Sequence, residues 1–192
     1  GIVGLYLKKK SLHSKLGFYL SGMLDNMSSR GPDSAGFAIY NNKESKKNYK
    51  YSLCTNNNTL SNKFEKNVKK YFKDIKIKNI SDHTVVLTSA SPKKFISYMQ
   101  KNFNEISLVG YGKSIEIFKQ VGNPKEIVKK FKLANFSGSH AIGHTRMATE
   151  SAITADGSHP YSTGEDECLV HNGSLSNHNN LRRQLIKKGK TF

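Results

Sequence analysis

Short apolar runs alternate along this chain with segments in which apolar residues recur every three or four positions. The opening run "GIVGLYL" at residues 1–7 is partly β-branched and predicts a strand, and Leu16, Leu20 and Leu24 then recur at helical spacing. Glycine and proline in "SSRGPDSAG" at 28–36 end that helix, and "GFAIY" resumes an extended segment. Strands that alternate with helices favour a layered fold of α and β elements.

The alternation continues beyond an exposed, Asn- and Lys-rich connection at 41–50. In the first helix after it, we expect Leu60, Phe64, Val68 and Tyr71 to share one face. Further helices are expected at 93–104, at 123–131 with Asn123 as cap, and at 176–189 with Ser176 as cap. Strands are expected near 48–53 and at 84–90, 106–112, 114–122, 140–148 and 167–173. The units at about 43–112 form a small α/β insertion in a single domain.

Lysine dominates the charge of the chain. The net charge is +17, and 27 of the 31 basic residues are lysine, because arginine occurs only at Arg30, Arg146, Arg182 and Arg183. The lysine runs are interleaved with Asn and Ser rather than with aromatic residues, which is typical of a solvated face. We therefore expect no nucleic-acid partner. Nucleic-acid binding stays open as an alternative that a strongly salt-dependent affinity would reveal.

Apolar runs and cysteines limit the class of protein further. No apolar run approaches the roughly 20 residues of a membrane span, and no secretory leader pattern opens the sequence. Cys54 and Cys168 are too few for a disulfide framework and are most simply small buried hydrophobic residues. These patterns predict a cytoplasmic protein with no membrane partner.

Three stretches differ from ordinary core or loop sequence. They are "SSRGPDSAG" at 28–36, "GHTRMATESA" at 143–152 and "LVHNGSLSNHN" at 169–179. The first two contain arginine, whose planar guanidinium suits carboxylates. Each stretch alone is a weak signal, whereas all three in this order, after an apolar N-terminal strand, are a strong one.

Together the three stretches resemble the glutaminase domain of the class II glutamine amidotransferases, members of the N-terminal nucleophile hydrolase superfamily. The resemblance covers the chain apart from about 41–135. Within the family, "HTRMATESA" and "CLVHNGSLSNHNNLRR" are most similar to stand-alone amidotransferase subunits related to glutamate synthase and N-methylglutamate synthase. The resemblance implies an α+β fold, a four-layer α/β/β/α sandwich that carries the insertion at about 43–112. It also implies a glutaminase that passes ammonia from glutamine to a partner synthase subunit.

The resemblance bears on both ends of the sequence. In the family, a cysteine precedes a strand similar to "GIVGLYL" and is the nucleophile, and its α-amine, with an ordinary pKa of about 7.7–8.0, is the base. We therefore expect a nucleophilic cysteine directly before Gly1. The ending "GKTF" comes before the segment whose acidic side chain reads the substrate α-amine in the family. We expect residues 1–192 to be a type 2 amidotransferase domain truncated at both ends.

The turn "HNG" matches the oxyanion-binding turn of the family. The Asn172 side-chain amide and the Gly173 backbone N–H are the expected donors, and glycine permits a close backbone approach. Taken alone, an Asn-Gly pair would be a β-turn. Arg30 resembles the arginine beside the nucleophile, with a surface turn arginine as the alternative. Asp33 is expected to brace that turn.

Arg146 ends an apolar strand, where packing does not require a long cation. The resemblance implies that Arg146 pairs with the substrate α-carboxylate, and a salt bridge to Glu150 is the alternative. Met147, Thr149 and His159 are implied to form the rest of the substrate wall. Better-known members carry Trp and His where this chain has Met147 and Glu150, so the tightness of closure over the substrate is an open question.

Other polar residues receive no catalytic role. His144 and His171 lie inside predicted apolar strands and are expected to be satisfied core histidines. No His, Cys or Asp cluster has metal-ligand spacing, and no Gly-rich phosphate loop is present, so we expect neither a metal nor a cofactor.

Two functions are compatible with these patterns. The sequence predicts a glutaminase whose ammonia passes to a synthase subunit. The alternative is a non-catalytic, amidotransferase-like regulatory or assembly subunit. The residue encoded immediately before Gly1 distinguishes the two.

Overall fold

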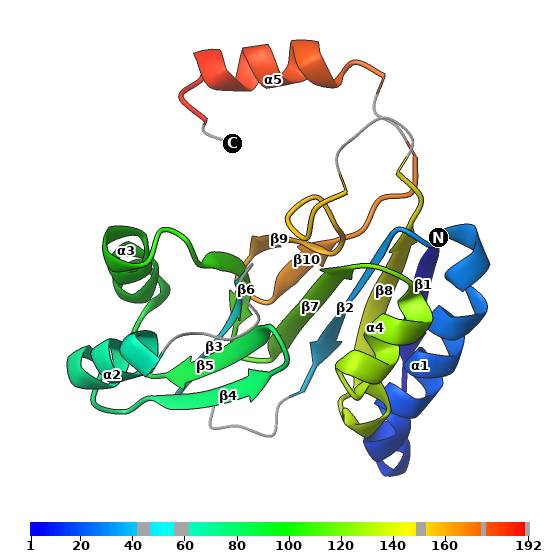
Figure 1. The fold of residues 1–192 in the computed structure, drawn as a ribbon, viewed down its shortest axis with the longest axis horizontal. Helices are drawn as coiled ribbons and strands as arrows, with labels where there is room; N and C mark the ends of the chain where they lie inside the picture. The colour runs from blue at the N-terminus through cyan, green and yellow to red at the C-terminus, as the bar shows by residue number, and fades with distance from the viewer. Residues whose placement is uncertain (42–46, 56–61, 149–152, 174–175, 191–192) are drawn as a thin grey trace.

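The computed structural model describes residues 1–41, 47–55, 62–148, 153–173 and 176–190 (Figure 1). These residues form two four-stranded antiparallel sheets, a two-stranded hairpin and five α-helices. The predicted α+β class is therefore confirmed. Within the same residues, no helix has the length and apolar character needed to cross a membrane.

The first sheet contains both the N-terminal strand and the strand that ends at Arg146. In spatial order its strands are β1 (Ile2–Tyr6), β8 (His140–Arg146), β2 (Ser34–Tyr40) and β7 (Ile115–Val121). Ile2 lies opposite His144, and Ser34 lies opposite Arg146. The start of the chain, the turn before β2 and Arg146 therefore meet at one end of this sheet.

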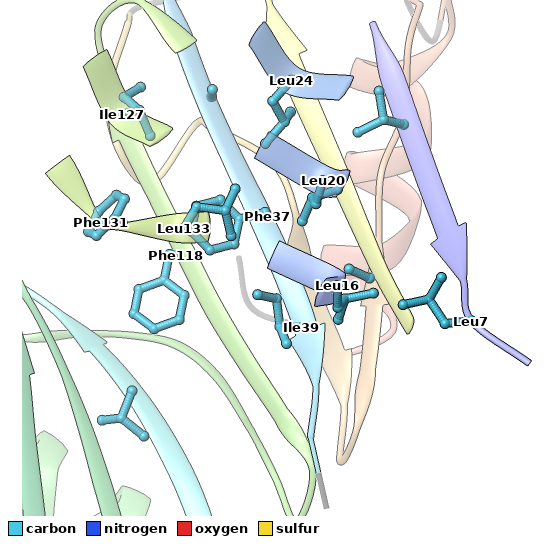
Figure 2. Packing of buried hydrophobic residues seen from close by; sticks show 14 of the residues in the cluster. Leu7, Leu16, Leu20, Leu24, Phe37, Ile39, Phe118, Ile127, Phe131 and Leu133 are labelled. Atoms are coloured by element: carbon cyan, nitrogen blue, oxygen red, sulfur yellow. The ribbon is translucent and has the colours of Figure 1, made fainter. Parts of the chain in front are cut away.

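Two helices, α1 (Leu16–Asn26) and α4 (Pro124–Lys130), cover one face of the first sheet (Figure 1). Leu16, Leu20 and Leu24 are fully buried, and they face the sheet from successive turns of α1 (Figure 2). Complete burial of one such side chain stabilises the fold by about 1.5–3 kcal/mol. The four-residue spacing of these leucines therefore holds α1 on the sheet. The rest of this core includes Phe37, Ile39, Phe118, Ile127, Phe131 and Leu133.

Residues 49–112 form a second sheet with its own helices. In spatial order its strands are β4 (Lys76–Ile80), β5 (His83–Thr88), β3 (Tyr49–Cys54) and β6 (Ser107–Gly112). Helices α2 (Asn62–Tyr71) and α3 (Pro92–Asn102) share a separate core with these strands. The chain order is β-α-β-β-α-β, a split β-α-β arrangement.

Buried polar contacts join the two sheets. The Lys50 ammonium on β3 is 2.8 Å from the Glu116 carboxylate on β7, and both side chains are nearly inaccessible to solvent. The Ile117 N–H donates a hydrogen bond to Ser52 Oγ at 3.0 Å. Removal of one member of such a buried ion pair leaves an uncompensated charge, so loss of either Lys50 or Glu116 would destabilise this contact between β3 and β7.

The C-terminal third departs from two predictions. The strand expected at 167–173 ends at Leu169, because β10 (Glu167–Leu169) pairs with β9 (Tyr161–Gly164) over three residues only. His171 therefore lies beyond the strand and is exposed, so its prediction as a core histidine was wrong. Helix α5 (His178–Lys187) has Asn177 rather than Ser176 at its N-cap, and no side chain caps it.

The second sheet and α4 bear on three further predictions. Strand β4 was not predicted, because its sequence "KIKNI" is polar, as suits an exposed strand at the edge of a sheet. Tyr71, predicted on the buried face of α2, is 53% exposed, and Leu60 lies outside the described residues. The Asn123 cap is confirmed, since its side-chain oxygen accepts a hydrogen bond from the Lys125 N–H at 2.9 Å.

Candidate active site

The start of β1 lies against the end of β8. The Gly1 carbonyl accepts a hydrogen bond from the Thr145 N–H at 2.9 Å, and the Gly1 nitrogen donates to the Thr145 carbonyl. The Gly1 nitrogen is close enough to Arg30 to feel its positive charge. Arg30, at the end of the 3-10 turn Ser28–Arg30, therefore acts on the beginning of β1.

The turn after Arg30 is held by the end of β8. Gly31 is buried so closely against the Thr145 and Arg146 backbone that a side chain there would clash. The Asp33 N–H donates a hydrogen bond to the Arg146 carbonyl at 3.1 Å, and its carboxylate accepts one from the Ala148 N–H at 2.7 Å. Asp33 thus braces this turn, as its sequence context predicted.

Arg146 is the last residue of β8 and is half-buried. Met147 follows it and is 55% exposed. Thr149 and Glu150 both lie outside the described residues. The substrate contact at Thr149 and the alternative ion pair between Arg146 and Glu150 therefore stay predictions.

Beside Arg146, the buried His144 contacts the half-buried His159. The His144 and His159 ring centroids are 4.3 Å apart, and Tyr161 meets His159 edge-on at 4.4 Å. His144 is 4% exposed, and Nδ1 of His159 has no hydrogen-bond partner among the described residues. The His171 backbone lies within reach of the His144 ring, although neither His144 ring nitrogen makes a hydrogen bond of ordinary geometry to the described residues. His144 is therefore a core histidine, as predicted, but its ring nitrogens lack the well-formed hydrogen bonds that the prediction implied.

The surroundings of this pair disfavour a positive charge. Burial is the main cause that lowers the pKa of both rings to about 4. The charge of Arg146 is the next cause for His159, followed by His171 and Lys119. Both rings are consequently neutral at pH 7. Arg146 and His171 are both close enough to act on His159.

Lys119 of β7 binds the backbone of the segment that carries His159. Lys119 is 5% exposed, and its ammonium donates hydrogen bonds to the Asp156 carbonyl at 3.2 Å and the Ser158 carbonyl at 3.1 Å. Gly36 of β2 packs against the His159 carbonyl so closely that a Cβ at this position would clash with it. The buried Lys119 ammonium and the absence of a side chain at Gly36 therefore allow this segment to pack on the first sheet.

The turn that contains Asn172 and Gly173 follows the β9–β10 hairpin. Both residues are exposed, and Gly173 has a φ of +150°, a conformation that favours glycine. The hairpin is fixed at its tip, where the Asp166 carboxylate accepts hydrogen bonds from the Lys113, Ser114 and Ile115 N–H groups at 2.8–3.0 Å. The loop between β6 and β7 thus anchors the hairpin that leads to this turn.

The structure brings some of the sequence-predicted site residues together and leaves others apart. Arg30 is close to the start of β1, and Arg146 and His159 lie together at the same end of the sheet. His171, the residue before Asn172, is close enough to His159 to lower its pKa. Met147 is exposed next to Arg146, and Thr149 is not described. Within the described part of the chain, no group of three or more His, Cys, Asp or Glu residues could hold a metal ion.

Comparison with known proteins decides the family. No family model matches the chain. All of it aligns, at 45% identity, with 64% of the glutamine amidotransferase-like protein GlxB of Rhizobium meliloti. It also aligns over its whole length, at 30% identity, with 67% of a Methanothermobacter thermautotrophicus protein described as "Putative glutamine amidotransferase". The chain belongs to the glutamine amidotransferases.

A shorter match connects this amidotransferase to larger enzymes. About half of the chain, 48%, is 33% identical to part of the glutamine–fructose-6-phosphate aminotransferase (isomerizing) of Methanococcus maripaludis, where it covers 16% of that enzyme. The chain spans about two thirds of the length of the two relatives that it matches throughout.

Sequence reasoning missed three residues that shape the candidate site. The buried Lys119 was part of the predicted strand "SIEIFKQVG", where a cation within an apolar run was the available signal. Asp166 had no signal beyond its place in the turn "GEDE". His144 was expected to be a core residue, but its contact with His159 joins residues far apart in the sequence and could not be foreseen.

Proposed function

We propose that this chain is the glutaminase part of a class II amidotransferase, which hydrolyses glutamine to glutamate and ammonia. The observation that carries the proposal is the convergence of Arg30, Arg146 and His159 at the end of the sheet where β1 begins. A nucleophile attached directly before Gly1 would enter this cluster. The family membership supports the same reaction.

In the proposed reaction, a cysteine directly before Gly1 attacks the side-chain amide carbon of glutamine. Its α-amine takes the thiol proton, and the leaving nitrogen receives a proton as the carbon–nitrogen bond breaks and ammonia departs. Water then hydrolyses the γ-glutamyl thioester to glutamate and free thiol. Arg30 beside the start of β1 favours the thiolate and lowers the pKa of an amine held there.

Two donors would stabilise the oxyanion of each tetrahedral intermediate. The Asn172 side-chain amide and the Gly173 N–H belong to an exposed turn whose glycine has a positive φ, so both are free of the constraints of strand pairing. Donors placed in advance need no reorganisation when charge develops on the oxygen. His171, directly before Asn172, is close enough to His159 to lower its pKa, which supports placing these donors beside the site.

The amino-acid end of glutamine would bind on the opposite side of the reacting carbon. We assign the α-carboxylate to Arg146, which can bind it with two parallel hydrogen bonds, and the neighbouring wall to Met147, Thr149 and His159. His159 is neutral at pH 7, so it would contact substrate as a hydrogen-bonding ring rather than as a cation.

The proposal extends to the fold and the partner. We propose that the first sheet and its helices α1 and α4 are two layers of an α/β/β/α N-terminal nucleophile sandwich, with residues 49–112 as the insertion. We also propose that ammonia passes to a synthase subunit. The name of the aminotransferase relative supports the use of glutamine as a nitrogen source, and the acceptor here is a separate question.

The test uses the full-length protein purified from its complete coding sequence. We expect glutamine-dependent ammonia release and its loss when the cysteine before Gly1 is replaced by alanine. Ammonia release that survives this substitution would sink the mechanism. A coding sequence without cysteine at that position would instead support the non-catalytic subunit.

A further inference from the structure

Helices α2 and α3 enclose a groove on the second sheet unit, at the end of the molecule away from α1 and α4 (Figure 1). Its volume is about 840 Å³, within the range of sites that accept a ligand or a peptide side-chain cluster. The lining residues that matter here are Lys70, Lys93, Lys94, Lys101, Tyr71 and Tyr98. The proposed glutaminase residues lie on the other sheet, so the groove is a separate feature.

The groove is basic, and its lining contains no acidic residue that would neutralise the lysines. Four lysines line it, and none of these lysines forms an ion pair with a carboxylate of the described residues. On the same helix, the neighbouring Lys69 is paired with Glu65 at 3.0 Å. Lysines that line one groove without carboxylate partners raise the local positive potential and attract an anionic group.

The aromatic floor of the groove is already organised by the protein. Tyr71 stacks on Tyr98 with ring centroids 4.3 Å apart, and the Tyr98 hydroxyl donates a hydrogen bond to the Asn67 carbonyl at 3.3 Å. The Lys94 ammonium lies 5.7 Å from the Tyr71 ring centroid and 5.8 Å from that of Phe72. These contacts hold the two tyrosine rings in place, while Tyr71 keeps 53% of its surface exposed.

We propose that the α2–α3 groove binds an acidic segment of a partner protein. Carboxylate side chains would pair with the lysines, while the half-exposed Tyr71 supplies the aromatic contact that is typical of interface hot spots. A second copy of this chain is a poor occupant, because its net charge of +17 repels another copy. The proposal does not rest on the glutaminase reaction.

The experiment measures binding of a fluorescein-labelled peptide of alternating glutamate and leucine to the full-length protein, by anisotropy at fixed ionic strength. The groove variant combines Lys70→Gln, Lys93→Gln and Lys101→Gln. The control variant combines Lys8→Gln, Lys10→Gln and Lys188→Gln, so both lose the same charge from exposed positions. We expect the groove variant to weaken peptide binding by about tenfold, since three ion pairs are lost, and the control variant to weaken it much less.

Several outcomes would overturn the proposal. Equal weakening in both variants would show that the peptide senses net charge alone. Undetectable binding to the wild-type full-length protein would mean that the groove is covered by another part of that protein or binds no acidic segment. Tighter binding of a single-stranded RNA of equal charge, lost only in the groove variant, would favour a nucleic acid. If thermal unfolding shows that the triple groove variant is destabilised, Lys101→Gln and Lys8→Gln alone are compared.

Discussion

The Asp166 carboxylate accepts two hydrogen bonds from Ser114, one from the Ser114 N–H at 2.8 Å and one from the Ser114 hydroxyl at 2.9 Å. Ser114 lies between β6 and β7, and Asp166 lies at the tip of the β9–β10 hairpin. Burial alone would raise the pKa of Asp166, but the hydrogen bonds from Ser114, Ile115 and Lys113 outweigh it and lower the pKa. The hairpin before Asn172 is therefore attached through a charged carboxylate to the loop that joins the two sheets.

Replacement of this carboxylate tests the attachment. Asp166→Asn keeps the shape and suits the positive φ of 57°, but it loses charge-assisted hydrogen bonds. We expect a loss of about 1–2 kcal/mol in the free energy of unfolding, reduced by the partial exposure of the site. Urea denaturation measures it. Glu165→Gln is the control, since Glu165 is an exposed neighbour of equal charge. Equal stability of the two variants would contradict the attachment.

The pH dependence of stability tests the His144–His159 pair. The folded pKa of each ring is about 4, below the ordinary value of about 6.5, so the unfolded chain binds more protons between these values. Unfolding free energy should therefore fall as the pH decreases from about 6.5 to 4, and this contribution should be constant above 6.5.

A matched pair of variants isolates that contribution. His144→Phe removes one buried titrating ring, so its stability should decrease less steeply over the same pH interval. His178→Gln changes an exposed histidine of α5 and should keep the steeper dependence of the wild type. Urea denaturation at several pH values measures both. If His144→Phe has the same slope as wild type, His144 does not resist protonation in the folded state.

Local patterns predicted the helical and core part of the fold well. The spacing of Leu16, Leu20 and Leu24 was enough to define α1 and its buried face, because helix periodicity is a property of neighbouring residues. Asn123 before Pro124 was enough to start α4 for the same reason. By contrast, β4 is stabilised by its pairing with β5, which a polar five-residue sequence does not reveal.

The candidate site likewise contains residues that the sequence predicted and contacts that it did not. The motifs selected Arg30, Arg146 and the 171–173 turn, because each lies in a short sequence with unusual chemistry. The ring contact between His144 and His159 and the binding of that segment by Lys119 depend on contacts between strands and loops far apart in the chain. A sequence pattern does not specify which side chains such contacts leave without hydrogen bonds.

Arg146→Lys tests the proposed carboxylate contact in the full-length protein. Lysine keeps the charge but loses the two-pronged geometry of the guanidinium. We expect the KM for glutamine to rise by the equivalent of about 1.5–3 kcal/mol, with a smaller change in kcat. Arg183→Lys on the exposed face of α5 is the control. Unchanged KM and kcat in Arg146→Lys would remove Arg146 from the substrate site.

Asn172→Ala separates an oxyanion donor from a residue that merely shapes a turn. A donor aimed at developing charge acts mainly in the transition state, so its removal should lower kcat far more than it raises KM. We expect kcat to fall on the order of 100- to 1000-fold, about 2.7–4 kcal/mol. Because Asn172 is exposed, thermal unfolding should change little.

The control for this prediction is Asn177→Ala, which removes another exposed amide that caps nothing at the start of α5. It should leave kcat within a few-fold of wild type. Gly173→Ala adds a separate test, because a side chain at a φ of +150° strains the backbone that carries the second donor. If Asn172→Ala instead unfolds the protein while its folded fraction keeps the wild-type kcat, Asn172 stabilises the turn and the oxyanion assignment fails.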